Sequence, residues 1–200
     1  MNPKKTAIIL VDDDNDFLSE KGKLYPAVKD NLDANHVITN INKLINNARK
    51  QGVTIIHVPI VFSADYHEMG EEPYGIFKVV KEAGAFQRDS WGAQVADTLD
   101  VDDSDIIVDN KSGTCAFATT DLDNVLKSRG ITNIALGGLL TNICIETTMR
   151  TAYDKGYKVY GLVDCSATMS DEQQQASIDN NWPLLSIPLK HEDFLMQLDA

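Results

Sequence analysis

The sequence predicts an α/β fold: a three-layer, doubly wound, mostly parallel sheet with helices on both faces. Two observations lead to this prediction. Apolar stretches of strand length alternate along the chain with amphipathic stretches of helical period, as in parallel sheets whose strands are joined by helices. The strand-like stretches are also apolar at successive positions, which is typical of strands that are covered on both faces.

The first expected element is a strand over residues 7–11, with the sequence Ala-Ile-Ile-Leu-Val. Another apolar run, at residues 106–108, predicts a strand later in the chain. Three stretches have apolar residues at helical spacing and predict helices that each bury one face. They cover residues 37–48, 118–126 and 145–152.

A recurring unit joins these helices to further strands. Three times, a basic turn and a glycine close the helical stretch, and an apolar run follows. Glycine can adopt the left-handed conformation that ends a helix, and cations suit the negative end of the helix dipole. The glycines are Gly52, Gly130 and Gly156, and the strands expected after them cover residues 53–58, 131–136 and 157–163.

Residues 61–92 interrupt this alternation and contain Gly70, Pro73, Gly75 and Gly84. Irregular segments of this length are usually functional, so we expect an insertion close to the site. No low-complexity segment or linker divides the chain. We therefore predict a single domain over residues 1–200.

Composition narrows the class of function. The chain has 18 basic and 30 acidic side chains, a net charge of −12, and such a field disfavours nucleic acids and anionic membranes. No apolar run reaches the roughly 20 residues that a membrane span requires, and no secretory segment follows Met1. Three cysteines without a CxxC pair argue against disulfides and zinc knuckles. We expect a cytoplasmic protein.

Three chemically useful side chains follow three expected strands. Asp12 comes directly after residues 7–11, Lys111 follows residues 106–108, and Cys144 follows the Gly137-Gly138 pair. Ligands of such sheets bind beyond the carboxyl ends of the strands. An acid, a cation and a thiol at that edge can together activate a thiol nucleophile. Alternatively, Asp12 belongs to a solvated turn and Lys111 is a surface charge.

Cys144 has the strongest case among the cysteines. With Thr141 as N-cap, it falls in the first turn of the expected helix, where the helix dipole favours thiolate and free N–H groups can hold an oxyanion. The alternative is a small core residue, which most lone cysteines are. That alternative is the prediction for Cys115 and Cys165, since neither begins a helix after a glycine turn.

Three ordered motifs surround these residues. Residues 12–17 are close to a D-x-Q-N-D-F pattern. Lys111 is followed by Cys115-Ala116-Phe117, Thr120 and Leu122, at the spacing of a lysine motif with S-A-F, T and L. Residues 138–145 match G-x-x-T-x-x-C-V. In these motifs, and over nearly its whole length, the chain resembles the isochorismatase-like superfamily of cysteine hydrolases, which includes nicotinamidases and N-carbamoylsarcosine amidohydrolases.

The resemblance implies roles for these residues. Asp12 would shuttle protons, Lys111 would be its electrostatic partner, and Cys144 would be the nucleophile. A cis peptide between Leu139 and Leu140 would aim the N–H of Leu140, with that of Cys144, at the oxyanion. The implied reaction cleaves a C–N bond of a small amide, ureide or lactam through a thioester. No cofactor is implied, and relatives commonly assemble, so a homo-oligomer is expected.

Some positions depart from the pattern or leave alternatives open. Asp14 replaces the usual glutamine; facing the pocket it would raise the proton affinity of Asp12 or attract a cation, and facing solvent it would do neither. Phe17, Trp91 and Phe117 are expected pocket walls for a small planar substrate, although aromatic residues are by default core.

Nicotinamidases bind a metal through a D-x-H pair and further histidines. The sequence Asp65-Tyr66-His67 mimics the pair, but no second histidine follows nearby. Two ligands seldom make a tight site, so we predict no metal.

Three rival functions remain open. A catalytically silent relative could bind or scaffold other molecules. The acidic run at residues 12–14 also resembles the opening of a receiver domain, but the Lys-Pro pair that a receiver needs is missing. A phosphatase of the haloacid dehalogenase type could use Asp12 and Asp14, but it would need a later acidic metal motif that is not evident.

Overall fold

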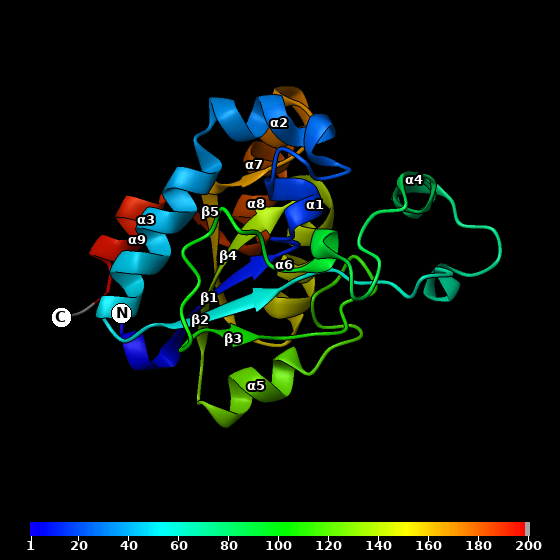
Figure 1. The fold of residues 1–200 in the computed structure, drawn as a ribbon. Helices are drawn as coiled ribbons and strands as arrows, with labels where there is room; N and C mark the ends of the chain where they lie inside the picture. The colour runs from blue at the N-terminus through cyan, green and yellow to red at the C-terminus, as the bar shows by residue number, and fades with distance from the viewer. Residues whose placement is uncertain (199–200) are drawn as a thin grey trace.

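The computed structural model describes residues 1–198, and its six-stranded sheet is parallel at every strand pair (Figure 1). The strand order is β3-β2-β1-β4-β5-β6. The chain therefore builds outward from β1 to β3 and then returns to the other side of β1, so the order reverses between β1 and β4. The strands are β1 (Thr6–Val11), β2 (Thr54–Val58), β3 (Ile106–Ile107), β4 (Asn133–Leu139), β5 (Lys158–Ala167) and β6 (Ile187–Leu189).

Helices cover both faces of this sheet (Figure 1). The α-helices are α1 (Asn15–Leu18), α2 (Tyr25–Ala34), α3 (Val37–Lys50), α4 (Gly75–Ala83), α5 (Leu122–Ser128), α6 (Glu146–Asp154), α7 (Asp171–Asn180), α8 (Trp182–Leu185) and α9 (His191–Met196). Short turns of other helical types are η1 (Pro3–Lys5), η2 (His67–Met69), η3 (Trp91–Ala93) and η4 (Thr141–Ile145). The predicted α/β fold is confirmed.

Two apolar cores lie on the two faces. Side chains alternate across a strand, so β1 sends Ile8 and Leu10 into a core formed with α2, α3 and α9. Ala7, Ile9 and Val11 enter the second core, which includes residues of α5, α6 and α8. Every residue of β1 is buried. This explains why its sequence is apolar at successive positions.

Several predicted boundaries differ from the structure, two of them by four residues. The helix expected over residues 118–126 begins at Leu122, with Asp121 as its N-cap. Just before it, the Thr120 hydroxyl accepts the Leu122 N–H at 3.1 Å and donates to the Ala116 carbonyl at 2.5 Å, so residues 116–120 form a turn of their own. The strand expected over residues 157–163 continues to Ala167.

The expected insertion at residues 61–92 is more ordered than its composition indicated. It contains η2 and α4, and Figure 1 shows α4 standing away from the sheet. Its two ends come together where Phe62 pairs with Gln87. The far part of this segment is therefore a projection, and its ends lie closer to the sheet.

No helix within residues 1–198 combines the length and apolar character needed to cross a membrane. The predicted domain of residues 1–200 includes Asp199 and Ala200, which lie outside the described residues.

Candidate active site

The candidate site lies at the carboxyl ends of β1 and β4, where the strand order reverses. Val11 pairs with Gly138 at this point. Gly138 has φ of +112°, and a Cβ on it would lie 2.0 Å from the Val11 carbonyl oxygen. Only glycine allows this approach. The peptide bond that follows, between Leu139 and Leu140, is cis.

Asp12 leaves the end of β1 with a φ of +55°, and its N–H donates to the Val58 carbonyl of β2 at 3.1 Å. The Lys111 Nζ lies 2.6 Å from the Asp12 Oδ1, and both side chains are fully buried. Lys111 is held by its backbone, because it bridges to Ile60 and its carbonyl accepts the Val61 N–H at 2.8 Å. The acid and the cation thus form one buried ion pair.

Cys144 lies in η4, the π-helical turn before α6. Its thiol is hydrogen-bonded to the Asp12 carboxylate, and the Leu140 N–H donates to its sulfur. The structure therefore brings together Asp12, Lys111 and Cys144, the three residues predicted from separate strand ends. Only 6% of the surface of Cys144 is exposed.

Burial dominates the electrostatics of the thiol. Burial and the negative charge of Asp12 raise the pKa of Cys144 far above its ordinary range, and they outweigh Lys111 and the Leu140 N–H, which lower it. At rest the site therefore holds a thiol. The expectation that the start of the helix favours a thiolate is wrong for this closed state, since it considered the local dipole and not the loss of solvent.

The predicted capping role of Thr141 is also wrong. Leu140 is the N-cap residue of η4, and its side chain makes no capping hydrogen bond. The Thr141 hydroxyl instead donates to the Gln174 Oε1 of α7 at 2.5 Å. The turn is therefore tied to a neighbouring helix and not capped by its own side chain.

The buried ion pair prepares Asp12 to accept a proton. Burial raises the pKa of Asp12, while Lys111 and the Cys144 thiol lower it, and burial prevails. Burial lowers the pKa of Lys111, but the charges of Asp12 and Cys144 outweigh it and the net shift is upward. The site thus combines a permanent cation with a carboxylate that is more basic than usual.

Asp14 does not face solvent, because it is fully buried. Its Oδ2 accepts the Ile60 N–H at 3.2 Å, and the charges of Asp12, Asp13 and Lys111 act on it. Of the two alternatives left by the sequence, the solvent-facing one is therefore excluded.

A chain of buried charges behind the site was not found by sequence reasoning. The Asp13 Oδ2 lies 2.5 Å from the Nδ1 of His57, and the Nε2 of His57 lies 3.4 Å from the Asp105 Oδ2. Arg49 completes the chain, with its Nη2 2.7 Å from the same Asp105 oxygen. Burial lowers the pKa of His57, but its two carboxylate neighbours outweigh burial and raise it. The one available signal was a histidine inside the apolar run of β2.

Asn15 and Asp16 fix the segment that returns from the insertion. The amide of Asn15 donates to the carbonyls of Trp91 and Val95, at 3.1 and 3.5 Å. Asp16 accepts the Phe86 N–H at 2.8 Å. The motif at residues 12–17 contains both residues, but the sequence did not show that their side chains hydrogen-bond to the backbone of this returning segment.

The three aromatic residues expected as pocket walls have different surroundings. The ring of Phe17 is buried, 4.9 Å from that of Phe86, whereas Trp91 is 39% exposed. The ring of Phe117 stacks on Tyr157, which precedes β5. Asp12, Lys111 and Cys144, which we call the triad, lie beyond the carboxyl ends of the strands. The contact of Phe117 lies at the start of β5, so it gives no support to a role for Phe117 as a pocket wall.

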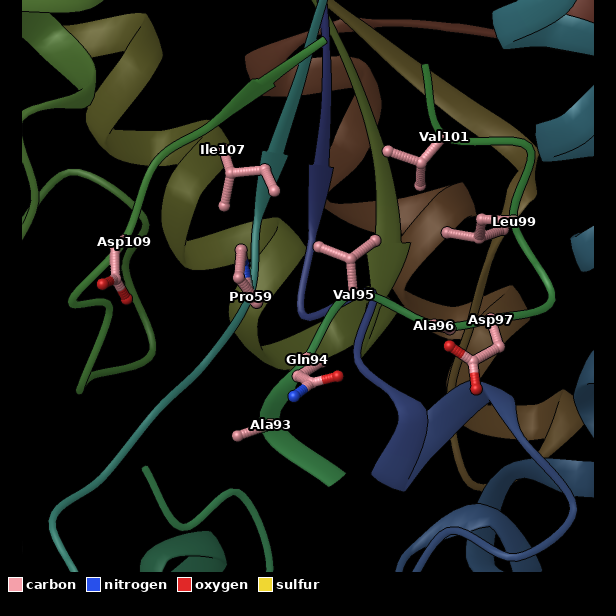
Figure 2. Close-up of a pocket in the computed structure, with 10 residues that line it drawn as sticks. All are labelled: Pro59, Ala93, Gln94, Val95, Ala96, Asp97, Leu99, Val101, Ile107 and Asp109. Carbon is pink, nitrogen blue, oxygen red and sulfur yellow. The ribbon is translucent and has the colours of Figure 1, made fainter. Parts of the chain in front are cut away.

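A hollow of about 500 Å³ lies at the β3 edge of the sheet (Figure 2). Its apolar lining includes Val95, Leu99 and Ile107, and the carboxylates of Asp97 and Asp109 lie around it. None of the triad residues lines it. Its size therefore does not make it the substrate site.

The Asp65–His67 pair is exposed, with Oδ1 and Nδ1 2.9 Å apart. Within residues 1–198, a set of three side chains with ligand atoms close enough for one metal ion occurs at Asp164, Cys165 and His191, and the pair belongs to no such set.

Comparison with known proteins gives consistent relationships. A family model described as the isochorismatase domain matches residues 6–193. Ureidoacrylate amidohydrolase RutB of Rhizobium rhizogenes is 30% identical over 192 residues, which cover 90% of this chain and 78% of that protein. The uncharacterized isochorismatase family protein YwoC of Bacillus subtilis is 30% identical over 198 residues, which cover 98% of this chain and 95% of that protein.

Among solved structures, a cysteine hydrolase from Pseudomonas syringae pv. phaseolicola superposes with a TM-score of 0.84 at 27% identity and covers 98% of this chain and 93% of its own. The N-carbamoylsarcosine amidase of Thermoplasma acidophilum shares the fold, with a TM-score of 0.70 at 19% identity and coverage of 94% and 97%. Because the family model spans nearly the whole chain and the sequence relatives match at least 90% of it, the chain belongs to the isochorismatase family of hydrolases.

Proposed function

We propose that the chain hydrolyses a C–N bond of a small amide or ureide with Cys144 as nucleophile. The observation that carries the proposal is the contact between the Cys144 thiol and Asp12, which Lys111 pairs at 2.6 Å. A nucleophile bonded to a base, with the base held by a third group, is the arrangement of covalent catalysis. The Cys115 thiol donates to the Thr151 hydroxyl at 3.3 Å and has no carboxylate partner among the described contacts. The Cys165 thiol donates to Asp164 at 3.8 Å, and His191 lies 2.8 Å from the other oxygen of Asp164, but Cys165 is fully buried and this carboxylate has no lysine partner among the described residues.

In the first half of the reaction, Asp12 accepts the thiol proton while the sulfur attacks the substrate carbonyl carbon. The Leu140 N–H, which donates to the resting sulfur, and the Cys144 N–H would receive the oxyanion. The C–N bond then breaks, Asp12 returns the proton to the departing nitrogen, and a thioester remains on Cys144.

In the second half, water attacks the thioester carbonyl and Asp12 accepts a proton from it. Collapse of the oxyanion breaks the C–S bond, releases a carboxylic acid and returns the proton to sulfur. One water is consumed for each C–N bond cleaved. Lys111 keeps the Asp12 charge paired throughout, since the raised pKa of Lys111 holds it as an ammonium.

The relatives and the site support a small amide or ureide as substrate. The similarity to ureidoacrylate amidohydrolase covers 90% of the chain. The rings of Phe17 and Trp91 are the proposed walls, and the exposed part of Trp91 can contact a planar group. We also propose that the protein acts in the cytoplasm as a homo-oligomer, as the sequence predicted.

Access to the nucleophile requires the site to open, because Cys144 is nearly closed off. We expect iodoacetamide to modify Cys144 slowly, and a turned-over substrate to protect it. Cys165 is fully buried and serves as the internal control. If Cys165 were labelled faster than Cys144 in the folded protein, the proposal that the site opens to expose Cys144 would be wrong.

An ammonia-release screen over amides and ureides, run with and without a chelator, tests the function. We expect at least one small amide or ureide to be turned over, with the rate unchanged by the chelator. Loss of activity on chelation, restored by a metal ion, would contradict the proposed mechanism. Failure across the panel by a folded protein would instead favour the catalytically silent alternative.

A further inference from the structure

The acidic run at the end of β1 contains more buried carboxyl groups than nearby cations. Asp12, Asp13 and Asp14 are all fully buried. Asp12 has Lys111 at 2.6 Å, and Asp13 has the imidazole of His57 at 2.5 Å. Asp14 is therefore the carboxyl group in the run without an ion-pair partner among the described residues.

The hydrogen bonding of Asp14 is equally incomplete. Its Oδ2 accepts one N–H, from Ile60 at 3.2 Å. Its Oδ1 has no hydrogen-bond partner within residues 1–198. Asp13 also has one unbonded oxygen, but its other oxygen faces a ring that can carry a proton. A charge held by one backbone N–H, and otherwise away from water, is too costly to persist, so such a group takes up a proton.

Within residues 1–198, no cation other than Lys111 is found to act on Asp14. The residues paired with this part of the chain, Gln94, Val95 and Ala96, have no ionisable side chain. The groups whose charges act on Asp14 are Asp12 and Asp13, which favour the proton, and the more weakly acting Lys111, which opposes it. Burial is the largest influence, and it raises the pKa of Asp14 well above its usual value.

We propose that Asp14 is a positioning residue that stays protonated at neutral pH, so that Asp12 keeps the charge balance it needs beside the Cys144 thiol. The proton lies on Oδ1, because Oδ2 accepts the Ile60 N–H. Ionisation of Asp14 at higher pH would add a second, unpaired negative charge near Asp12 and would make the thiol harder to ionise. The role in catalysis rests on the proposed function, but the protonation of Asp14 does not.

Asp14→Asn tests the protonation without any substrate. The asparagine keeps the shape and neutrality of a protonated aspartate, so the variant should be more stable than the wild type at neutral pH. The folded state of the wild type has the higher Asp14 pKa. It therefore loses stability as pH rises above about 4, the ordinary pKa of an unfolded aspartate. The gain in melting temperature should accordingly be absent near pH 4 and grow as pH rises.

Asp13→Asn is the matched control, because it removes a carboxyl group of the same burial that has an imidazole partner. It should lower the melting temperature at neutral pH. Infrared spectra at pH 7 should show the carbonyl band of a protonated carboxylic acid in the wild type and in Asp13→Asn, and no such band in Asp14→Asn. A wild type without this band, or an Asp14→Asn variant that is unfolded or as destabilised as Asp13→Asn, would overturn the proposal.

The pH profile of kcat/KM on a turned-over substrate tests the positioning role. Asp14→Asn should keep its activity to higher pH than the wild type, because the asparagine at position 14 cannot ionise beside Asp12. An alkaline limb identical in the two proteins would remove the positioning role and leave the protonation intact. Absence of any turned-over substrate would count against the proposed function alone, since melting and infrared measurements need none.

Discussion

Two lysine–aspartate pairs in this molecule have nearly the same length and different surroundings. Lys111 and Asp12 lie 2.6 Å apart at the buried ends of the strands, and Lys127 and Asp123 lie 2.7 Å apart on the surface of α5. Each lysine lowers the pKa of its aspartate, but the net pKa shifts of the two carboxyl groups are opposite. The pKa of Asp12 is raised because burial prevails, whereas Lys127, Tyr157 and Lys155 outweigh burial at Asp123 and lower its pKa to about 2.

The comparison shows that solvent, more than ion-pair distance, decides what an acid can do. At the surface, water already stabilises the charged carboxylate, so the lysine holds it in its ionised form. At the buried site the cost of desolvation keeps the carboxylate ready to accept a proton. A buried pair can therefore act as a base, and a surface pair of the same geometry is a weak structural contact.

The largest expected effect concerns the thiol beside the buried pair. Cys144→Ala should reduce turnover by a factor on the order of 10⁴ or more, because covalent attack is lost. The fold should remain, since alanine removes one small sulfur from the core. Ammonia release by the purified variant measures the effect, and Cys115→Ala should retain activity. Wild-type turnover by Cys144→Ala would exclude the mechanism.

The next effect compares the two lysines directly. Lys111→Met leaves Asp12 buried without its cation and should cost about 3–5 kcal/mol of unfolding free energy. Lys127→Met removes a solvated partner and should cost about 0.3–0.5 kcal/mol. Urea unfolding of both variants gives the two values. Similar losses would show that burial does not separate the pairs.

A smaller effect concerns the pH dependence at the surface pair. The folded-state pKa of Asp123 is about 2, below the ordinary value near 4. The stability that its carboxylate adds is therefore complete above about pH 4 and lost as pH falls towards 2. The melting temperatures of the wild type and Asp123→Asn should converge over that range. At higher pH the wild type should be the more stable of the two, whereas Asp14→Asn should be more stable than the wild type.

The smallest effect is expected at the exposed pair of the projecting segment. The side chains of His67 and Asp65 are 68% and 74% exposed. Neither reaches the triad through a described contact, so His67→Ala should leave turnover and melting temperature unchanged. A marked loss of activity, in assays with and without added zinc, would show that this segment takes part in the site.

Much of the fold could be predicted because it depends on local periodicity. The apolar run of β1 indicates that both of its faces are buried, and the spacing of apolar residues in α3 indicates which face of that helix is buried. The convergence of Asp12, Lys111 and Cys144 could also be predicted, since parallel strands end at one edge of a sheet. The glycine at position 138 was visible, but its contact with Val11 was not.

The features that were missed depend on contacts between distant residues or on solvent. Asp13 and His57 are 44 positions apart, and nothing in the sequence indicates that their side chains meet. The protonation state of the Cys144 thiol was mispredicted because the prediction considered the dipole at the start of the helix and not the burial of the thiol. Thr141 was mispredicted because its partner, Gln174, lies 33 residues further along the chain.

The central claim is that the sulfur of Cys144 carries the acyl group between the two halves of the reaction. Acid quenching of the wild type during turnover, followed by peptide mass mapping, tests it most directly. The account predicts a mass increase equal to the acyl fragment on the Cys144 peptide, removable by hydroxylamine. Steady turnover with the acyl fragment on the Cys115 or Cys165 peptide, and none on Cys144, would contradict it.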